Sequence, residues 1–551
     1  MPSAPVKYAL TALFLIAVGT FSAKLSQAQS ASTATPTPTA PVITGSQLPH
    51  LGDGSDMTSS AERRLGDKIV RELYRDPDYL DDPVLVEYVQ AIWQPLLAAA
   101  RLRGDVPDEL AERFAWEILL GRDRSINAFA LPGGYFGLHL GLVGVVASRD
   151  ELASVLAHEL SHVTQRHISR LIAKQSAQTP WLIGAMILGA LAASKNPDAA
   201  NAVMVGGQAL AAQNQLNFSR DMEREADRMG FGVMTQAGFE SRAFVTMFDK
   251  LQQAARLNDN GAFPYLRSHP LTTERIADMQ ARQQAGASAP GLVAVTLEHA
   301  MVAARARVLS NPGVDALRAW AVDADAKNLA GTPAPRQAAA LYGATLAGMR
   351  LRDFPQAGRF LTRLAELTRA DAPAARQTRL LGAELALAAG DTRRATAFLD
   401  GSLDVKGDAH LPGVMGRPEL FLWSQATLSI GQGGGAAGSG ASGASGAGGA
   451  GDVAIVAQRL QTWVATHPRD ATAWQLLSAA YAAQGQTLRA IRAEAEVQVA
   501  QLDYAAAGER FKAAQDLVRS RVAGTDHIEA SIIDTRAREV QSILREQALE
   551  R

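Results

Sequence analysis

Cysteine is absent from the 551 residues of the chain. Its absence excludes thiolate zinc sites, disulfide frameworks and cysteine nucleophiles, so any metal site must be built from histidine, aspartate and glutamate. Neither sign of charge dominates, because the formal net charge is −1, and this balance indicates no nucleic acid and no acidic substrate as a partner. The apolar fraction of 47% is ordinary for a globular protein, and the length suggests about two to four domains.

Long apolar runs are lacking beyond the N-terminus. Lys7 precedes an apolar run from Tyr8 to Ala23, and Ser26-Gln27-Ala28 ends on the small residue of a cleavage site. We interpret residues 1–28 as a secretory signal peptide that is cleaved, which indicates a periplasmic location. An uncleaved anchor is the alternative, but the run is shorter than the ~20 residues that span a bilayer comfortably. No later run reaches that length, so no stable membrane span is expected.

Changes in composition divide the rest of the chain. A stretch rich in Ser, Thr, Ala and Pro cannot bury enough surface to order itself and is predicted to be a disordered linker. From about residue 300 the chain is Ala- and Leu-rich with helical periodicity, interrupted by a Gly/Ser/Ala tract. The expected order is a linker at 29–45, a folded domain at 46–290, helical repeats at 300–432, a Gly/Ser-rich insertion at 433–451 and tetratricopeptide-like repeats at 452–551.

The fold class is predicted to be α+β and mostly helical. β-structure is expected only within residues 112–147, where Glu117-Ile118-Leu119-Leu120 is a candidate strand. The segments 126–131 and 135–138 are expected to be strands joined by a turn at Pro132-Gly133-Gly134. In the C-terminal part, the spacing of Trp474, Leu477, Tyr481 and Ala490 is typical of tetratricopeptide repeats, with an unrelated helical bundle as the alternative.

The motif HExxH occurs at residues 158–162, on a helix that Ser148 and Glu151 begin as a capping box. Residues i and i+4 share one helical face, so His158 and His162 can bind one ion. Glu159 projects beside them and can take a proton from water at the open side of the metal. The alternative is a helix that carries two histidines by chance. We predict one Zn²⁺ per chain, with Glu159 as the general base.

A third ligand is needed, because catalytic zinc takes three protein ligands and keeps one position open. Glu223 and Asp227 lie at i and i+4 of a second predicted helix, roughly residues 218–236. Glu223 can bind the metal, while Asp227 either accepts a hydrogen bond from a ligand imidazole or shuttles protons. Glu225 competes for the ligand role, although its side chain points about 200° round the helix from Glu223. From the spacing alone, residues 223–227 could equally form a charged helix face that is exposed to solvent.

The positions of His167, a possible strand edge and an apolar run relative to the motif helices suggest a role for each. His167 lies five residues after His162 and about 140° from the ligand face, so it is expected to be structural. A strand edge near Asn127 and Tyr135 is a candidate for pairing with an extended peptide. The apolar run at 181–193 lies between the two metal-binding helices and is expected to form a lid, with a membrane-surface element or a core helix as the alternatives.

Several motifs together resemble those of the M48 peptidase family, namely HELSHV at 158–163, Arg166-His167 and EREAD at 223–227. Other segments resemble a periplasmic subgroup with helical repeats: LGD at 51–53, NAFALPGG at 127–134 and SHP at 268–270. The resemblance implies that 46–290 is an M48-like zinc metallopeptidase domain, with Glu223 as third ligand and Asp227 as a catalytic proton donor. For His269 it implies a fourth position on zinc that keeps the enzyme latent, although a histidine before proline is usually a structural loop residue.

The same resemblance implies a function. The expected protein is a periplasmic zinc metalloendopeptidase with a chaperone-like role, acting on unfolded or stalled outer-membrane β-barrel proteins and the β-barrel assembly machinery. Unpaired strands of such substrates suit capture by a strand edge. A repeat-based chaperone or adaptor with little proteolytic activity is the alternative. A membrane-embedded prenyl protease, as in other M48 members, is disfavoured by the lack of apolar spans.

Overall fold

The computed structural model describes residues 57–174, 219–257, 264–285, 295–310, 313–403, 415–433, 446–520 and 526–549. All of them belong to one unit of the chain, Gly54–Arg551. The predicted signal peptide at 1–28, the linker at 29–45 and the lid at 181–193 lie outside the described residues. Among the helices within them, none combines the length and apolar character that a membrane crossing requires.

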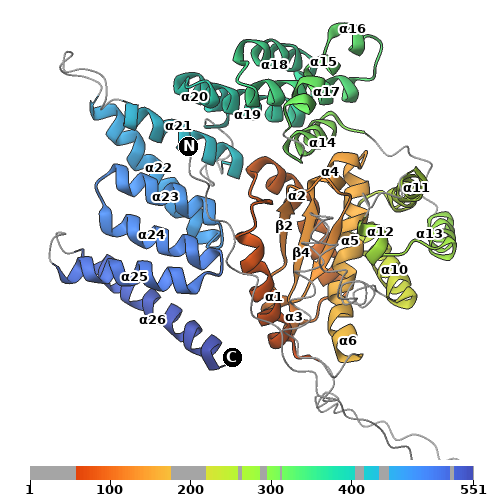
Figure 1. Cartoon of the computed structure of the whole chain (residues 1–551), viewed down its shortest axis with the longest axis horizontal. Helices are drawn as coiled ribbons and strands as arrows, with labels where there is room; N and C mark the ends of the chain where they lie inside the picture. The colour runs from red at the N-terminus through yellow and green to blue at the C-terminus, as the bar shows by residue number, and fades with distance from the viewer. Residues whose placement is uncertain are drawn as a thin grey trace, which may run out of the picture. The chain divides into compact units, whose positions relative to one another are not determined.

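The first part of the described chain contains a small sheet and the helices around it (Figure 1). Its helices are α1 (Ser59–Tyr74), α2 (Pro83–Leu102), α3 (Asp108–Arg113), α4 (Leu140–Val145), α5 (Arg149–Thr164), α6 (His167–Lys174), α10 (Arg220–Gln236), α11 (Arg242–Leu257), α12 (Pro264–Ser268) and α13 (Thr273–Ala285). Its strands are β1 (Tyr79–Leu80), β2 (Glu117–Gly121), β3 (Ala128–Leu131) and β4 (Tyr135–His139).

The sheet has the strand order β1-β2-β4-β3. β3 and β4 form the expected antiparallel hairpin, and Gly133 and Gly134 in its turn have φ of 75° and 80°, which glycine adopts without steric cost. β2 runs parallel to β4. β1 was not expected, because two residues give no periodicity. The prediction that Tyr135 lies on an exposed edge is wrong, since β4 is an inner strand and β3 is the edge next to it.

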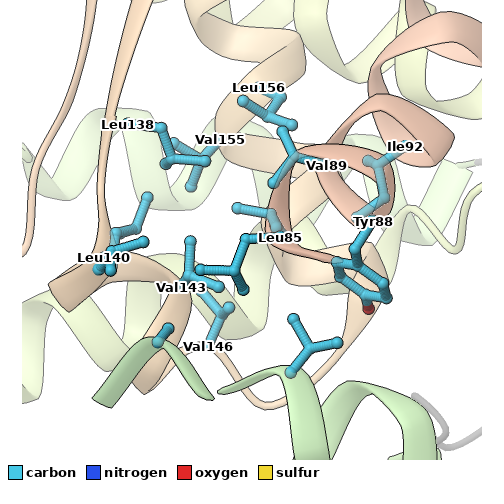
Figure 2. Packing of buried hydrophobic residues seen from close by; sticks show 14 of the residues in the cluster. Leu85, Tyr88, Val89, Ile92, Leu138, Leu140, Val143, Val146, Val155 and Leu156 are labelled. Atoms are coloured by element: carbon cyan, nitrogen blue, oxygen red, sulfur yellow. The ribbon is translucent and has the colours of Figure 1, made fainter. Parts of the chain in front are cut away.

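Residues of β2 and β4 alternate between two apolar layers. Leu119 and Tyr135 pack against α1, whereas Leu120 and Leu138 belong to the main core, to which α2 and α5 also contribute. Figure 2 shows part of this core, where side chains from α2, α4, β4 and α5 point toward one another: Leu85, Val89, Leu138, Val143, Val155 and Leu156. Burying each such side chain contributes about 1.5–3 kcal/mol, so α5 is held firmly against the sheet.

α5 begins where the capping residues predict. Ser148 is its N-cap, and its hydroxyl accepts a hydrogen bond from the amide of Glu151 at 3.1 Å. The Glu151 carboxylate accepts from the amide of Ala147 rather than from that of Ser148. Almost every residue of α5 is buried, including polar ones. A helix buried on all sides with polar side chains needs partners for them; those of Glu151 lie on α11, and two of those of His158 lie on α10.

The second part of the described chain is helical, as predicted. Its helices are α14 (Leu297–Ser310), α15 (Val314–Asp323), α16 (Ala326–Leu329), α17 (Ala334–Arg350), α18 (Phe354–Thr368), α19 (Ala372–Ala388), α20 (Thr392–Leu403), α21 (Arg417–Gly433), α22 (Gly446–Thr466), α23 (Ala471–Ala483), α24 (Thr487–Ala500), α25 (Tyr504–Arg519) and α26 (His527–Leu549). α22 begins inside the predicted 433–451 insertion, and the segment between α21 and α22 lies outside the described residues. The predicted α+β, mostly helical class is confirmed.

The connections between several of these helices share one geometry. In each, three residues join the helices and the middle one has positive φ: Arg352 (60°), Gly390 (80°), Gly485 (70°) and Leu502 (60°). An aspartate that caps the next helix follows the middle residue in three of these turns. Such repetition is typical of stacked helical repeats.

Candidate metal centre

Four buried side chains from three parts of the chain converge on one point. His158 and His162 come from consecutive turns of α5, Glu223 comes from the first turn of α10, and His269 directly follows α12. One ligand atom of each lies within 4.8 Å of the others. In Figure 1, α10 and α12 lie beside α5 on the side away from the sheet. The structure therefore brings together the three predicted zinc ligands and the predicted fourth group.

The distances between the ligand atoms suit a small tetrahedral ion. Ligands bonded at about 2.0–2.1 Å to such an ion lie roughly 3.3 Å apart. The Nε2 atoms of His158 and His162 are 3.0 Å apart, and the Glu223 carboxylate oxygens are 3.5 and 3.4 Å from them. Nδ1 of His269 is 3.4 Å from His158 Nε2 and 3.0 Å from Glu223 Oε1. Two imidazoles and a carboxylate are also a donor set that catalytic zinc uses.

Glu159 is buried beside this group. Neither of its carboxylate oxygens has a hydrogen-bond partner among the described residues, and Oε1 lies 3.6 Å from Nε2 of His269. A buried carboxylate without a hydrogen bond is costly, and such groups in native proteins usually have a functional reason. Glu159 is thus placed to accept a proton from a molecule bound at the centre.

Asp227 lies beside the first histidine of the motif. Its Oδ1 lies 3.0 Å from His158 Nδ1, the nitrogen that points away from the centre. Arg275 of α13 donates to both oxygens of Asp227 at 2.6 and 2.7 Å, and its Nη1 lies 2.7 Å from Glu223 Oε2. The role of Arg275 was not predicted, because no spacing in the sequence links it to the EREAD segment.

His167 lies outside the ligand group but contacts the second histidine, which the expected angle of about 140° did not indicate. Its Nδ1 is 2.9 Å from Nδ1 of His162. The predicted angle of about 140° assumed a continuous helix, but α5 ends at Thr164 and Arg166 turns the chain with a φ of 53°. Glu225 lies outside the ligand group, and its Oε2 is 3.1 Å from Nε2 of His167.

Burial and charge set the protonation of these groups in the absence of a metal. Burial alone would raise the pKa of Glu223 and Asp227, but neighbouring histidines for the first and Arg275 for the second hold both pKa values below the ordinary range. Burial lowers the pKa of His167 to about 4, despite the nearby carboxylate. Burial also disfavours the charged form of His158, but Asp227 and Glu223 outweigh it and raise its pKa to about 9. A metal ion must displace that proton to bind.

The fold and this site have the arrangement expected of a metallopeptidase domain. Residues 87–283 match the model of peptidase family M48. The matched segment contains the motif helix, Glu223, His269 and Arg275, so the predicted resemblance to this family is confirmed.

Two of the relatives match this chain over more residues than the family model does. The beta-barrel assembly-enhancing protease of Escherichia coli (strain K12) is 31% identical over 316 residues, 57% of this chain and 62% of the relative. A Vibrio cholerae protein whose name proposes the same role is 35% identical over 323 residues, 58% of this chain and 63% of the relative. The mitochondrial metalloendopeptidase OMA1 of Saccharomyces cerevisiae is 28% identical over 196 residues, 35% of this chain and 54% of the relative. The matches thus span less than two thirds of each relative.

Proposed function

We propose that this protein is a periplasmic zinc metalloendopeptidase that acts on outer-membrane β-barrel proteins. The observation that carries the proposal is the buried group of His158, His162, Glu223 and His269 with Glu159 beside it. The names of the relatives from E. coli and V. cholerae support the substrate class. Cleavage of the signal peptide after residue 28, association with the assembly machinery and the domain boundaries predicted above are part of the same proposal.

In this proposal His158, His162 and Glu223 hold zinc, which would supply Lewis acidity for the attack of water on a peptide carbonyl. Glu159 takes a proton from the attacking water and later gives it to the leaving amine. The edge strand β3 pairs with the extended substrate, since main-chain hydrogen bonds bind a peptide without demanding a sequence. Asp227 fixes the ring of His158 through Nδ1. Its ion pair with Arg275 favours this anchoring role over proton donation.

His269 is proposed to hold the fourth position at rest. Its Nδ1 lies within the ligand group, and Tyr265 stacks on its ring with centroids 4.7 Å apart. A histidine in that position excludes the water that Glu159 activates. His269→Ala should therefore raise basal proteolysis. A lower rate would instead indicate that His269 stabilises the transition state, and an unchanged rate would contradict both roles.

The first test is zinc content and hydrolysis of unfolded casein by the purified protein. Wild type should bind one zinc per chain, and Glu223→Gln should lose it. Asp221→Asn is the matched control, because Asp221 is an exposed acid on the same helix. Glu159→Gln should keep zinc but lose about 10²–10⁴-fold in hydrolysis, the usual contribution of general-base catalysis. Zinc retained by Glu223→Gln, or no zinc in wild type, would contradict the proposed site.

The repeat-based chaperone role is supported by the stacked helices α17 to α25 with their shared turn geometry. Glu159→Gln separates the two roles. If this variant still assists folding of a β-barrel protein in vitro, binding acts independently of proteolysis. If assistance disappears with hydrolysis, the chaperone-like role is not separate from the enzyme.

A further inference from the structure

A line of buried contacts leads away from the second histidine of the motif. Nε2 of His162 faces the ligand group, at 3.4 Å from Glu223 Oε1. Nδ1 of the same ring lies 2.9 Å from Nδ1 of His167, and Nε2 of His167 lies 3.1 Å from Oε2 of Glu225. Arg170 donates Nη1 to that same oxygen at 3.0 Å. Both imidazole rings are fully buried, whereas the Glu225 side chain is 29% exposed.

Metal binding by His162 would determine which nitrogen of each imidazole in this series of contacts carries a proton. A neutral imidazole carries one proton and one lone pair, and binding through Nε2 requires the lone pair on that nitrogen. The proton of His162 must therefore be on Nδ1, which lies 2.9 Å from His167 Nδ1 and can donate to it. His167 then accepts at Nδ1 and carries its own proton on Nε2, which it donates to Glu225. Every contact becomes a proper hydrogen bond in this one arrangement.

We propose that His167 and Glu225 are positioning residues that fix the tautomer and orientation of His162 and thereby strengthen zinc binding. This inference rests on the proposed zinc site. Outer hydrogen bonds to a ligand imidazole typically change metal affinity by about 10–100-fold. Neither residue belongs to the ligand group itself.

The second anchor parallels the first. Asp227 holds His158 through Nδ1 and is itself bound by Arg275. His167 holds His162 through Nδ1 in the same way, and Glu225, which contacts His167, is bound by Arg170. Glu225 and Asp227 lie on the same helix as the ligand Glu223, on different sides of it. α10 thus supplies one ligand and the terminal carboxylates that orient the other two. The packing of α10 against α5 therefore places the third ligand and both outer carboxylates together.

The test compares full-length variants by zinc dissociation constant, from competition with a chelator, and by the visible spectrum of the Co²⁺ form. In His167→Asn the amide oxygen can take the place of Nδ1 and accept from His162, whereas His167→Leu has similar bulk and no acceptor. His167→Leu should bind zinc about 10–100-fold more weakly with an altered Co²⁺ spectrum, and His167→Asn should recover most of the loss. Glu225→Ala should weaken binding and Glu225→Gln should not, since the amide still accepts from His167.

His299→Gln is the matched control for loss of a buried histidine. His299 is as buried as His167 but contacts Tyr88 and the Val146 carbonyl, away from the ligand group. The His299→Gln variant should have lower thermal stability and an unchanged affinity for zinc. The inference would be overturned, with the zinc site left intact, if His167→Leu and Glu225→Ala both bound zinc with wild-type affinity. It would also be overturned if His167→Leu and His167→Asn lost the same amount of zinc affinity. No zinc in wild type would instead overturn the proposed function. If His167→Leu does not fold, the Glu225 pair carries the test alone.

Discussion

Arg275 compensates two buried carboxylates, so its removal should destabilise the peptidase domain strongly. Its side chain is 3% exposed and holds Asp227 through two hydrogen bonds while lying 2.7 Å from Glu223. Removing one partner of a buried ion pair typically costs about 3–5 kcal/mol, because the other charge is left without compensation. At about 2–4 °C per kcal/mol for a domain of this size, Arg275→Met should lower the melting temperature by roughly 6–20 °C.

The same helix provides the control. Arg282 pairs with Asp278 on the surface of α13, with side chains 35% and 40% exposed. Exposed pairs contribute about 0–1 kcal/mol, so Arg282→Met should change the melting temperature little. Both variants are compared by thermal unfolding of zinc-free protein, because a bound dication would replace part of the charge that Arg275 provides. Added zinc should therefore reduce the loss in Arg275→Met.

A second variant separates charge from packing. In Arg275→Met with Asp227→Asn, one of the uncompensated charges is removed, so the melting temperature should recover in part. An Arg275→Met variant no less stable than Arg282→Met would refute the reasoning. So would a double variant that is less stable than Arg275→Met, because lost packing rather than charge would then explain the effect.

Three other changes probe the fold, the first beside the metal centre and the others elsewhere. Gly230→Ala should weaken zinc binding roughly tenfold, because the new Cβ would lie 3.0 Å from the Ala157 carbonyl oxygen and displace α10 from α5. Gly358→Ala is the control and should leave zinc binding unchanged, because no atom lies within 4 Å of its new Cβ. Burial lowers the pKa of His299 from 6.5, so the unfolded chain binds a proton that the folded protein resists. Thermal stability should therefore fall as the pH drops below about 6.5, and His299→Gln should flatten that slope. Arg352→Gly should raise the melting temperature of the repeats, since positive φ costs about 1–2 kcal/mol in a non-glycine residue and glycine loses only about 0.5–1 kcal/mol in entropy.

Local rules predicted the parts of the site that local structure determines. His158 and His162 share a face because they are one helical turn apart, and Ser148 begins that helix because its side chain satisfies a free amide. The β3–β4 hairpin followed from its Pro-Gly-Gly turn. Glu223 was chosen over Glu225 by side-chain direction together with the family resemblance, and only Glu223 lies in the ligand group.

Tertiary contacts determine what the sequence did not predict. Arg275 reaches Asp227 only because α13 packs against α10, and no pattern in the sequence records that contact. His167 was misplaced for a different reason. The helical angle was carried past the end of α5, where Arg166 adopts positive φ and returns the next side chain to the ligands. A helix end that the sequence does not mark makes every angle beyond it unreliable.

The position of α10 explains why metal binding should depend on how this domain is packed. Gly230 lets α10 approach the backbone of α5 at Ala157, directly before the first ligand. At that separation Glu223 reaches the ligand group, Asp227 reaches His158, and Glu225 reaches His167. A shift of α10 by a few tenths of an ångström would change all three contacts at once, because they share one rigid helix. The metal site is therefore sensitive to residues such as Gly230 that never touch the metal.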